Sequence, residues 1–281
     1  MHMIYMMRYS FFGHSGWRSV ASGDPAKLFD PKRLDEREYY LRKVALASLR
    51  DQADQDFELV VLSSSLMPAT YQKRLKDICH DMIGPRARVI FEDPGVVARK
   101  FHRYRMAHFT RYENTAQIVL DDDDALAVDF TGDLRGEATA ALALRKADGP
   151  EYCFLSFPRG LTAQFEDGRL DLIERNVPAT NLGLALVGPT QTNRSPFRVA
   201  HYKILERRPV RVVYTQEPQY LRSVHGSNDS KARRGDTLVD PEAMPQVLRA
   251  FPLLKDLRGD WEMDQTLRKL AKNPAQAYSP A

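Results

Sequence analysis

Four consecutive aspartates, Asp121 to Asp124, directly follow the apolar residues 118–120 and are the feature of this sequence most suited to chemistry. In an extended chain alternate side chains share a face, so Asp121 and Asp123 point the same way. Carboxylates this close repel one another, and a divalent cation placed among them relieves the repulsion. Ligands that are all oxygen suit Mg²⁺ or Mn²⁺, which commonly join one or two carboxylates to the phosphates of a substrate.

The plainer alternative for these four residues is a solvated acidic loop in which Asp124 caps the following helix. An acidic run taken alone favours that alternative. However, residues 118–120 (Ile-Val-Leu) predict a buried strand immediately before the acids. In open α/β sheets, ligands bind outside the carboxyl ends of the strands. The position of the run therefore favours a ligand site.

The elements that must position these carboxylates alternate between strand and helix in the first half, which predicts βαβ units and a parallel sheet. The expected strands are residues 3–9, 57–62, 88–91 and 117–120, and the expected helices are residues 34–50, 68–82, 96–112 and 133–147. Residues 13–33 are expected to form a loop because Gly and Pro recur there.

The second half of the chain contains several short, closely spaced segments that are predicted to be strands. They are residues 152–157, 161–166, 169–174, 182–187 and 210–214. Asp167-Gly168 predicts a hairpin between the second and third of them. Two helices are expected near 242–249 and 260–271, and residues 273–281 are expected to be a loose tail. With no clean boundary visible, residues 1–272 are expected to form a single domain, with a nucleotide-binding half over 1–126 and a second half over 127–272.

Composition limits the class of protein. The chain has 281 residues, 43% of them hydrophobic, and a formal net charge of +4, as expected of a soluble globular protein. No apolar run approaches the roughly 18 residues needed to cross a bilayer, so we expect no transmembrane segment, with peripheral membrane contact left open. Two cysteines, Cys79 and Cys153, exclude a disulfide scaffold and favour a reducing, cytoplasmic location.

The chain resembles the GT-A glycosyltransferases and, more narrowly, the bacterial family of putative rhamnosyltransferases. Residues 118–126 look like the DxD element of those enzymes. The segments 8–11 (RYSF), 57–63 (FELVVLS) and 225–229 (HGSND) add to the likeness, which covers roughly residues 3–250. The resemblance implies an α/β, GT-A-like nucleotide-diphospho-sugar transferase fold with a mixed central sheet flanked by helices.

The resemblance also implies a site. Asp121 would lie near the ribose and the metal, with Asp122 on the donor side as well. Asp123 would be the principal metal ligand, and Asp124 would bind the metal or orient its neighbour. GT-A enzymes often complete this site with a histidine from the C-terminal part, which would be His225. An imidazole added to carboxylates shifts the choice of metal from Mg²⁺ towards Mn²⁺. The alternative for His225 is a loop histidine bonded to the backbone.

Further donor contacts are carried over by position. Tyr9 and Ser10 follow the first strand, and Asp93 follows the third, where related enzymes contact the nucleobase. Arg99 and Arg103 share a face of the helix that borders the nucleotide in similar folds. They would meet a phosphate or the base; a solvated cationic face is the alternative.

An inverting transferase needs a carboxylate to take the proton of the acceptor. Asp229 is the candidate base because it lies in the same cluster as His225. Glu166, Asp167 and Glu174 are alternatives between which the sequence does not choose.

The function expected from these observations is metal-dependent transfer of a sugar, with rhamnose implied by the family name. The donor would be a nucleoside-diphosphate sugar and the acceptor a hydroxyl of a glycan or another molecule, in bacterial surface glycan synthesis. A metal-dependent phosphoryl-transfer enzyme or nuclease would also use clustered carboxylates. It would need further acids converging on a second metal, and no such set is identifiable. A nucleic-acid-binding module is supported only by the mild basic charge and by residues 231–234 (KARR), so nucleic acid is not expected as a partner.

Overall fold

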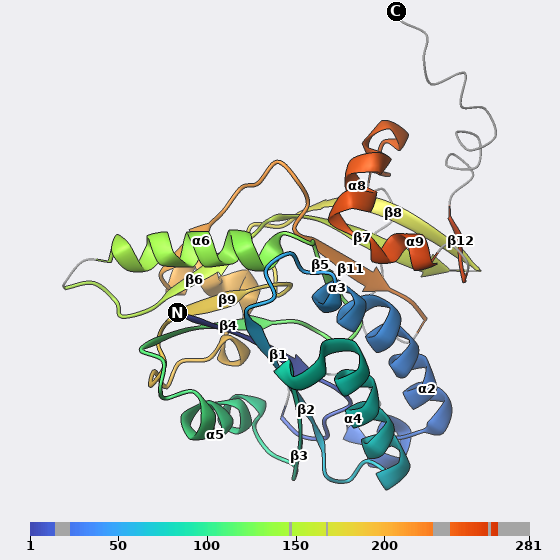
Figure 1. The fold of residues 1–281 in the computed structure, drawn as a ribbon, viewed down its shortest axis with the longest axis horizontal. Helices are drawn as coiled ribbons and strands as arrows, with labels where there is room; N and C mark the ends of the chain where they lie inside the picture. Colours follow the sequence, from blue (N-terminus) through green and yellow to red (C-terminus); the bar gives the residue numbers. More distant parts are fainter. Residues whose placement is uncertain (15–22, 146–147, 167, 227–236, 258–259, 264–281) are drawn as a thin grey trace, which may run out of the picture.

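The structure is a computed structural model and describes residues 1–14, 23–145, 148–166, 168–226, 237–257 and 260–263. Within these ranges the strands form two sheets (Figure 1). The first sheet has seven strands in the order β10-β6-β9-β4-β1-β2-β3, and the second has five in the order β12-β8-β7-β11-β5.

The strands and helices have the following bounds. The strands are β1 His2–Arg8, β2 Phe57–Ser64, β3 Ala87–Glu92, β4 Asn114–Val119, β5 Ala125–Leu126, β6 Cys153–Ser156, β7 Arg159–Glu166, β8 Arg169–Asn176, β9 Ala185–Pro189, β10 Val210–Val212, β11 Tyr220–Val224 and β12 Glu262–Met263. The α-helices are α1 Pro25–Leu28, α2 Pro31–Tyr40, α3 Ala47–Arg50, α4 Ala69–Ile83, α5 Val97–His108, α6 Phe130–Ala143, α7 Ile204–Arg207, α8 Met244–Ala250 and α9 Leu253–Leu257. A π-helical stretch, η2 Leu41–Leu46, joins α2 to α3, and η4 Pro196–Arg198 is a short 3₁₀ turn.

The first half of the chain forms the parallel part of the first sheet. β1 pairs in parallel with both β2 and β4, and β2 pairs in parallel with β3. β9 is antiparallel to β4 and to β6, so the sheet as a whole is mixed. The predicted fold class, a mixed central sheet flanked by helices, is confirmed.

Helices cover both faces of the first sheet. Alternate residues of β1 point to opposite faces, so Tyr5 packs with residues of α2, α4 and α6 whereas Ile4 packs with α5. Figure 1 shows α5 on one side of this sheet and α2 with α4 on the other. Because both faces are covered, the central strands are almost continuously apolar, and this made them recognisable in the sequence.

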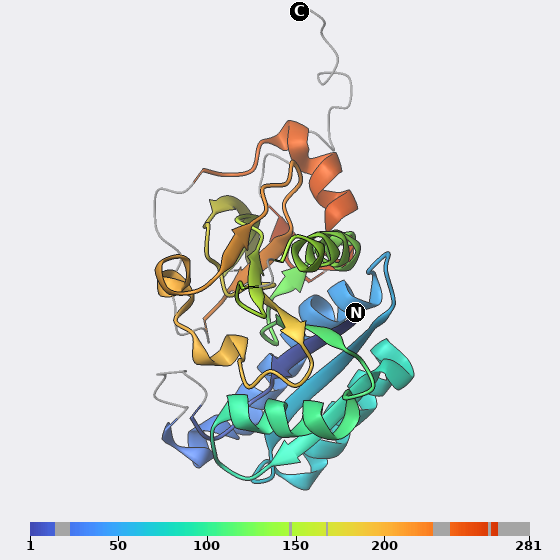
Figure 2. The same cartoon turned by 90° about the vertical axis from the view of Figure 1, so that its left-hand side faces the viewer.

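The second sheet has a core of its own, to which the N-terminal helices contribute. Leu161, Leu172 and Leu221 of this sheet pack with Phe251 and also with Tyr40 of α2. In Figure 2 the N-terminal strands (blue) lie towards one end of the molecule and the C-terminal helices (red) towards the other, with the later strands between them. The segment α2-η2-α3 therefore packs against both sheets.

Several boundaries differ from expectation. The loop expected over residues 13–33 contains α1 and the start of α2, because Asp24 and Asp30 cap these helices and a proline follows each at the first helical position. The helix expected at 133–147 begins at Phe130. Strands β5 and β11 and helix α9 were not predicted. Of the helix expected at 260–271, residues 262–263 form β12 instead. Residues 264–271 and the tail 273–281 lie outside the described residues.

Candidate functional site

The acidic segment, residues 121–124, joins β4 of the first sheet to β5 of the second. Asp122, Asp123 and Asp124 are only 0%, 6% and 6% exposed. A buried carboxylate is costly unless it is paired or hydrogen-bonded. The alternative of a solvated acidic loop is therefore wrong. The expected helix cap is also absent from Asp124, whose Oδ1 accepts a hydrogen bond from the Ser223 amide at 2.8 Å instead.

Arg37 of α2 holds two of these carboxylates. Its Nε donates to Asp122 Oδ2 at 3.1 Å, its Nη2 donates to Asp122 Oδ1, and its Nη1 donates to Asp123 Oδ2 at 2.9 Å. The guanidinium is buried with them. Sequence reasoning missed Arg37, although it falls at helical spacing between Leu34 and Leu41, on the face expected to be apolar. A charged residue on such a face indicates a buried partner.

The electrostatics of the acidic segment follow from burial and from these partners. Burial raises the pKa of Asp122 to about 6, against the opposing effect of Arg37. Burial also acts on Asp123, but Arg37 and His225 outweigh it and lower the pKa of Asp123 below its usual range. Burial and the neighbouring carboxylates raise the pKa of Asp124 well above its usual value. The segment thus contains three carboxyl groups with separate proton affinities.

His225 lies beside the acidic segment, directly after β11. Its Nε2 is 3.2 Å from Asp123 Oδ2, and its Nδ1 is 3.7 Å from Glu36 Oε1. The imidazole stacks on Tyr40 with the ring centroids 3.8 Å apart. Burial would lower the pKa of His225, but its hydrogen bonds with Asp123 and Glu36 raise it. The structure thus brings together His225 and Asp123, two residues that are far apart in the sequence.

Asp121 is the most accessible of the four aspartates, with 21% of its side chain exposed. Its Oδ1 accepts a hydrogen bond at 2.8 Å from Nη2 of Arg8, which ends β1. The Arg8 guanidinium also lies over the ring of Phe197, 5.2 Å from its centroid. Asp121 is therefore fixed in place while part of it stays open to a ligand.

Tyr9 and Ser10 turn inward. The Tyr9 hydroxyl donates to Leu34 O at 3.3 Å, and Ser10 Oγ accepts from Arg33 Nη1 at 3.1 Å. Ser10 has φ 43°, a left-handed conformation that is rare outside glycine. Both side chains are buried and tie the end of β1 to α2, so a donor contact at these positions would come from the backbone.

The three other predicted donor contacts lie near the edge strand β3. Asp93 directly follows β3, and α5 carries Arg99 and Arg103. Asp93 is exposed and accepts from Ser65 Oγ at 2.6 Å, Arg103 pairs with Glu92, and Arg99 is exposed. β3 is three strand spacings from β4, or about 14 Å. Only a ligand lying along the edge of the sheet would reach both Asp93 and the acidic segment.

The candidate base Asp229 and its alternative Asp167 lie outside the described residues. Glu166 is exposed on β7 and accepts from Gln164 Nε2 at 2.7 Å. Glu174 is exposed on β8 and borders a cavity of about 530 Å³.

The donor atoms around the acidic segment decide whether Mn²⁺ or Mg²⁺ would fit there. No three His, Cys, Asp or Glu side chains within the described ranges are already disposed as a metal cage. Both oxygens of Asp122 are taken by Arg37. Asp121, Asp123, Asp124 and His225 still offer carboxylate oxygens and one imidazole. These donor types fit Mn²⁺ or Mg²⁺, ions that often bind through few protein ligands and complete their shell with substrate phosphates.

Comparison with known proteins identifies the family. The sequence profile of a family described as "Putative rhamnosyl transferase" matches residues 2–237, a range that includes β1, the acidic segment and His225. The chain belongs to this family. The resemblance seen in the sequence is thereby confirmed at the level of a glycosyltransferase family. No curated protein matches the chain.

Solved structures resemble the chain at low sequence identity. TarS from S. aureus has 11% identity and a TM-score of 0.42, covering 80% of this chain and 37% of that one. TarS 1–349 in complex with UDP-GlcNAc has 12% identity and a TM-score of 0.42, covering 89% and 65%. A putative nucleotide-diphospho-sugar transferase from Desulfovibrio desulfuricans G20 has 13% identity and a TM-score of 0.38, covering 92% and 95%. The chain thus spans little more than a third of the full TarS chain. Among the described residues, none of the helices is both long and apolar enough to cross a membrane.

Proposed function

We propose that this protein transfers a sugar from a nucleoside-diphosphate donor to an acceptor hydroxyl, and that the acidic segment receives the donor's diphosphate. The observation that carries the proposal is the buried position of three aspartates at the carboxyl end of β4, where the two sheets meet. Membership of the rhamnosyl transferase family supports sugar transfer over phosphoryl transfer or nucleic-acid cleavage.

The protein's own side chains prepare the site for a polar ligand. Arg37 fixes Asp122 and Asp123, and Arg8 fixes Asp121, so the carboxylates need little reorganisation when the donor binds. A preorganised charged site stabilises charge that develops during a reaction more effectively than water does. Asp121, the most accessible of the four, is the group assigned to the ribose and the metal.

A divalent cation is part of the proposal. Asp121, Asp123, Asp124 and His225 would hold Mn²⁺ or Mg²⁺, with His225 favouring Mn²⁺. A cation bound there would neutralise the charge that builds up on the departing diphosphate. The family name supports rhamnose as the transferred sugar. We propose a bacterial surface glycan as the acceptor.

The test is release of free nucleoside diphosphate from a panel of nucleoside-diphosphate sugars, with Mn²⁺, with Mg²⁺ and with a chelator. We expect metal-dependent release that is greatest with a rhamnosyl donor. Asp123→Asn should lower the rate at least about 100-fold. Mutating a residue that only hydrogen-bonds to a metal ligand already lowers activity by up to about 100-fold, and Asp123 is proposed to bind the metal itself.

Asp129→Asn is the matched control, because Asp129 is exposed, lies close in sequence and makes no side-chain helix cap. Its rate should equal that of the unmodified protein. Full activity of Asp123→Asn, or equal losses in both variants, would overturn the assignment of the acidic segment.

A further inference from the structure

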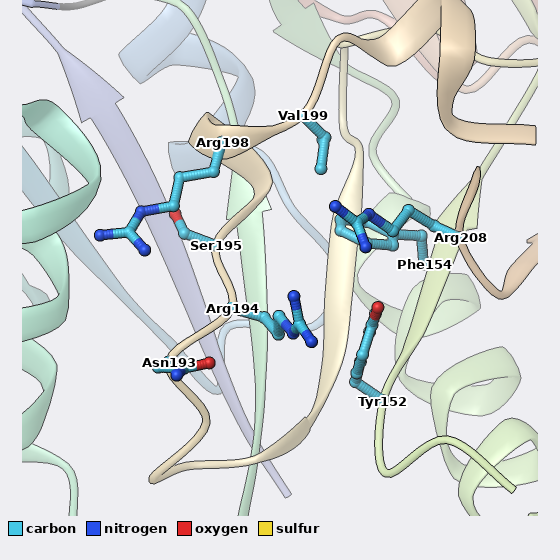
Figure 3. A pocket seen from close by; sticks show the side chains of 8 residues that line it. All are labelled: Tyr152, Phe154, Asn193, Arg194, Ser195, Arg198, Val199 and Arg208. Atoms are coloured by element: carbon cyan, nitrogen blue, oxygen red, sulfur yellow. The ribbon is translucent and has the colours of Figure 1, made fainter.

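A second polar cavity, of about 320 Å³, lies apart from the acidic segment. Three arginines, Arg194, Arg198 and Arg208, contribute to its lining together with the aromatic residues Tyr152 and Phe154. None of its lining residues is acidic. We call this cavity the arginine pocket (Figure 3).

The arginine pocket is built from segments that are distant in sequence. Tyr152 directly precedes β6 and Phe154 lies in it, Arg208 follows α7, and residues 193–199 lie between β9 and α7. Figure 3 shows Arg194 reaching towards Tyr152, while the Arg198 side chain extends to the opposite side of its segment. The Arg194 guanidinium carbon lies 5.5 Å from the centroid of the Tyr152 ring. Arg194 therefore lies against the aromatic wall, and Arg208 lines the same cavity.

The segment that carries Arg194 and Arg198 is held in place by a buried arginine of α5. Arg105 of α5 is only 1% exposed and donates from Nε to Thr190 O at 2.8 Å and from Nη2 to Thr192 O. Burial lowers the pKa of Arg105 to about 10. Such a buried cation is retained only where its hydrogen bonds are made, so it fixes the backbone just before the pocket. Pocket residue Ser195 accepts at Oγ from the Phe197 amide at 3.3 Å, which begins η4. The backbone that carries Arg194 and Arg198 is thus held in place, while their side chains are exposed to a ligand.

The arginine pocket is positively charged, which favours binding of an anion. No ion pair between Arg194, Arg198 or Arg208 and a carboxylate is present among the described residues. Like charges around one cavity repel each other, and a bound anion removes the repulsion. The planar guanidinium binds carboxylate and phosphate through paired hydrogen bonds, and an adjacent aromatic ring offers an apolar face to a sugar.

The pocket is connected to the candidate donor site through one short segment. Phe197 lies in the sequence between the pocket residues Ser195 and Arg198. Its ring stacks on Phe101 of α5, with ring centroids 5.0 Å apart. The Arg8 guanidinium carbon also lies over the Phe197 ring, 5.2 Å from its centroid, and Arg8 donates to Asp121 at 2.8 Å. The segment that lines the pocket therefore also contacts the arginine that holds Asp121.

We propose that the arginine pocket binds an anionic group of the acceptor, a phosphate or a carboxylate carried on a sugar, while the acceptor's hydroxyl lies at the acidic segment. The identity of the ligand as the acceptor rests on the proposed function. The existence of an oxyanion site rests only on the pocket itself. The acceptor class is thereby a negatively charged glycan.

The first experiment measures binding of inorganic phosphate and of glucuronate by titration calorimetry, with a nucleoside diphosphate and Mn²⁺ present in excess. Arg194→Gln/Arg208→Gln should weaken binding of the preferred probe at least about tenfold, because two charged hydrogen-bond partners are lost. Preference for phosphate indicates a phosphorylated acceptor, and preference for glucuronate indicates a uronic acid. Binding that is equal in the double variant and the unmodified protein would overturn the proposal, as would no binding of either probe.

Arg207→Gln is the matched control, since Arg207 is an exposed arginine of α7 beside Arg208 but does not line the pocket. It should bind both probes as the unmodified protein does. A loss as large as that of the double variant would show a general charge effect and would overturn the proposal.

The second experiment separates the pocket from the proposed function. Release of nucleoside diphosphate by hydrolysis of the donor, without acceptor, should be unchanged in Arg194→Gln/Arg208→Gln and lost in Asp123→Asn, while Asp123→Asn should keep its affinity for the pocket probe. If no donor is bound or cleaved but the probe still binds, the proposed function fails and the anion site stands. If the donor reacts but the probe does not bind, only the pocket fails.

Discussion

Arg37 determines how the acidic segment can exist inside the protein. Its single guanidinium faces Asp122 and Asp123, and all three groups are buried. Breaking such a pair by removing one partner leaves a charge in a medium that solvates it poorly. The arginine is thus both a structural requirement and the group that fixes the orientation of Asp123.

Arg37→Met should destabilise the protein strongly. We expect a loss of about 3–5 kcal/mol in the free energy of unfolding, measured by urea denaturation at pH 7, because two carboxylates lose their counter-charge. Adding Asp122→Asn to Arg37→Met should recover part of this loss. Lys32→Met is the control, because Lys32 is exposed on the same helix. A loss below about 1 kcal/mol for Arg37→Met, the range of exposed ion pairs, would contradict this account.

His225→Ala tests the proposed nitrogen ligand at the acidic segment. Nε2 lies 3.2 Å from Asp123 Oδ2, so one imidazole nitrogen is already beside the carboxylate assigned to the metal. We expect the affinity for Mn²⁺, measured by titration calorimetry, to fall about tenfold or more. His80→Ala, an exposed histidine of α4, should leave that affinity unchanged. If His225→Ala also leaves it unchanged, His225 is no part of the metal site.

At the scale of elements, β1 carries a buried histidine whose protonation is linked to stability. His2 stacks on Tyr112 with ring centroids 4.1 Å apart, and its Nε2 lies 3.3 Å from Glu58 Oε1. Burial lowers the pKa of His2 below 6.5, although Glu58 opposes the shift. The unfolded chain therefore binds a proton at His2 more readily than the folded chain does.

The lowered pKa of His2 makes the folded protein less stable as the pH falls. As the pH falls below the unfolded value of 6.5, stability should be lost until the folded pKa of His2 is reached, with a slope of at most about 1.4 kcal/mol per pH unit. His2→Phe keeps the ring stacking and should remove this component, as measured by urea denaturation between pH 7.5 and 5. His80→Gln, at an exposed position, should keep the full pH dependence. Identical profiles for His2→Phe and the unmodified protein would refute the linkage.

The elements that could be predicted are those whose pattern is local. The apolar run 57–62 identified β2 because a parallel strand is buried on both faces. β11 was missed because its sequence, Tyr-Leu-Arg-Ser-Val, has no continuous apolar pattern and it exists through pairing with β7 and β5. β5 is only two residues long and depends on the same pairing.

The site shows the same division between local and distant information. The acidic segment was predictable because its four carboxylates are contiguous and follow a strand. Arg37 could not be assigned to it from spacing, because it binds Asp122 from 85 positions away through the packing of α2. The arginine pocket likewise combines β6, the segment before α7 and Arg208, which no linear motif links.

At the scale of the whole molecule, the two sheets share their supporting elements. Tyr220 and Phe157 from the second half of the chain belong to the core beneath the first sheet. Tyr40 and Val44 from the first half belong to the core of the second sheet. The acidic segment is one of several places where the chain passes from one sheet to the other, so separating the sheets would also expose its buried charges. We therefore predict that the two sheets unfold together.

Thermal unfolding should therefore occur in one transition, with equal calorimetric and van't Hoff enthalpies, although chains of this length often unfold in steps. Phe157→Ala in the first core and Phe251→Ala in the second should each cost about 3–5 kcal/mol and should shift that one transition as a whole. Leu144→Ala, at a side chain that is 73% exposed, should leave it in place. Calorimetry that shows two transitions, with Phe157→Ala moving one and Phe251→Ala moving the other, would mean that the sheets fold independently. In that event the acidic segment would be a linker between domains, and Arg37 alone could not hold its geometry.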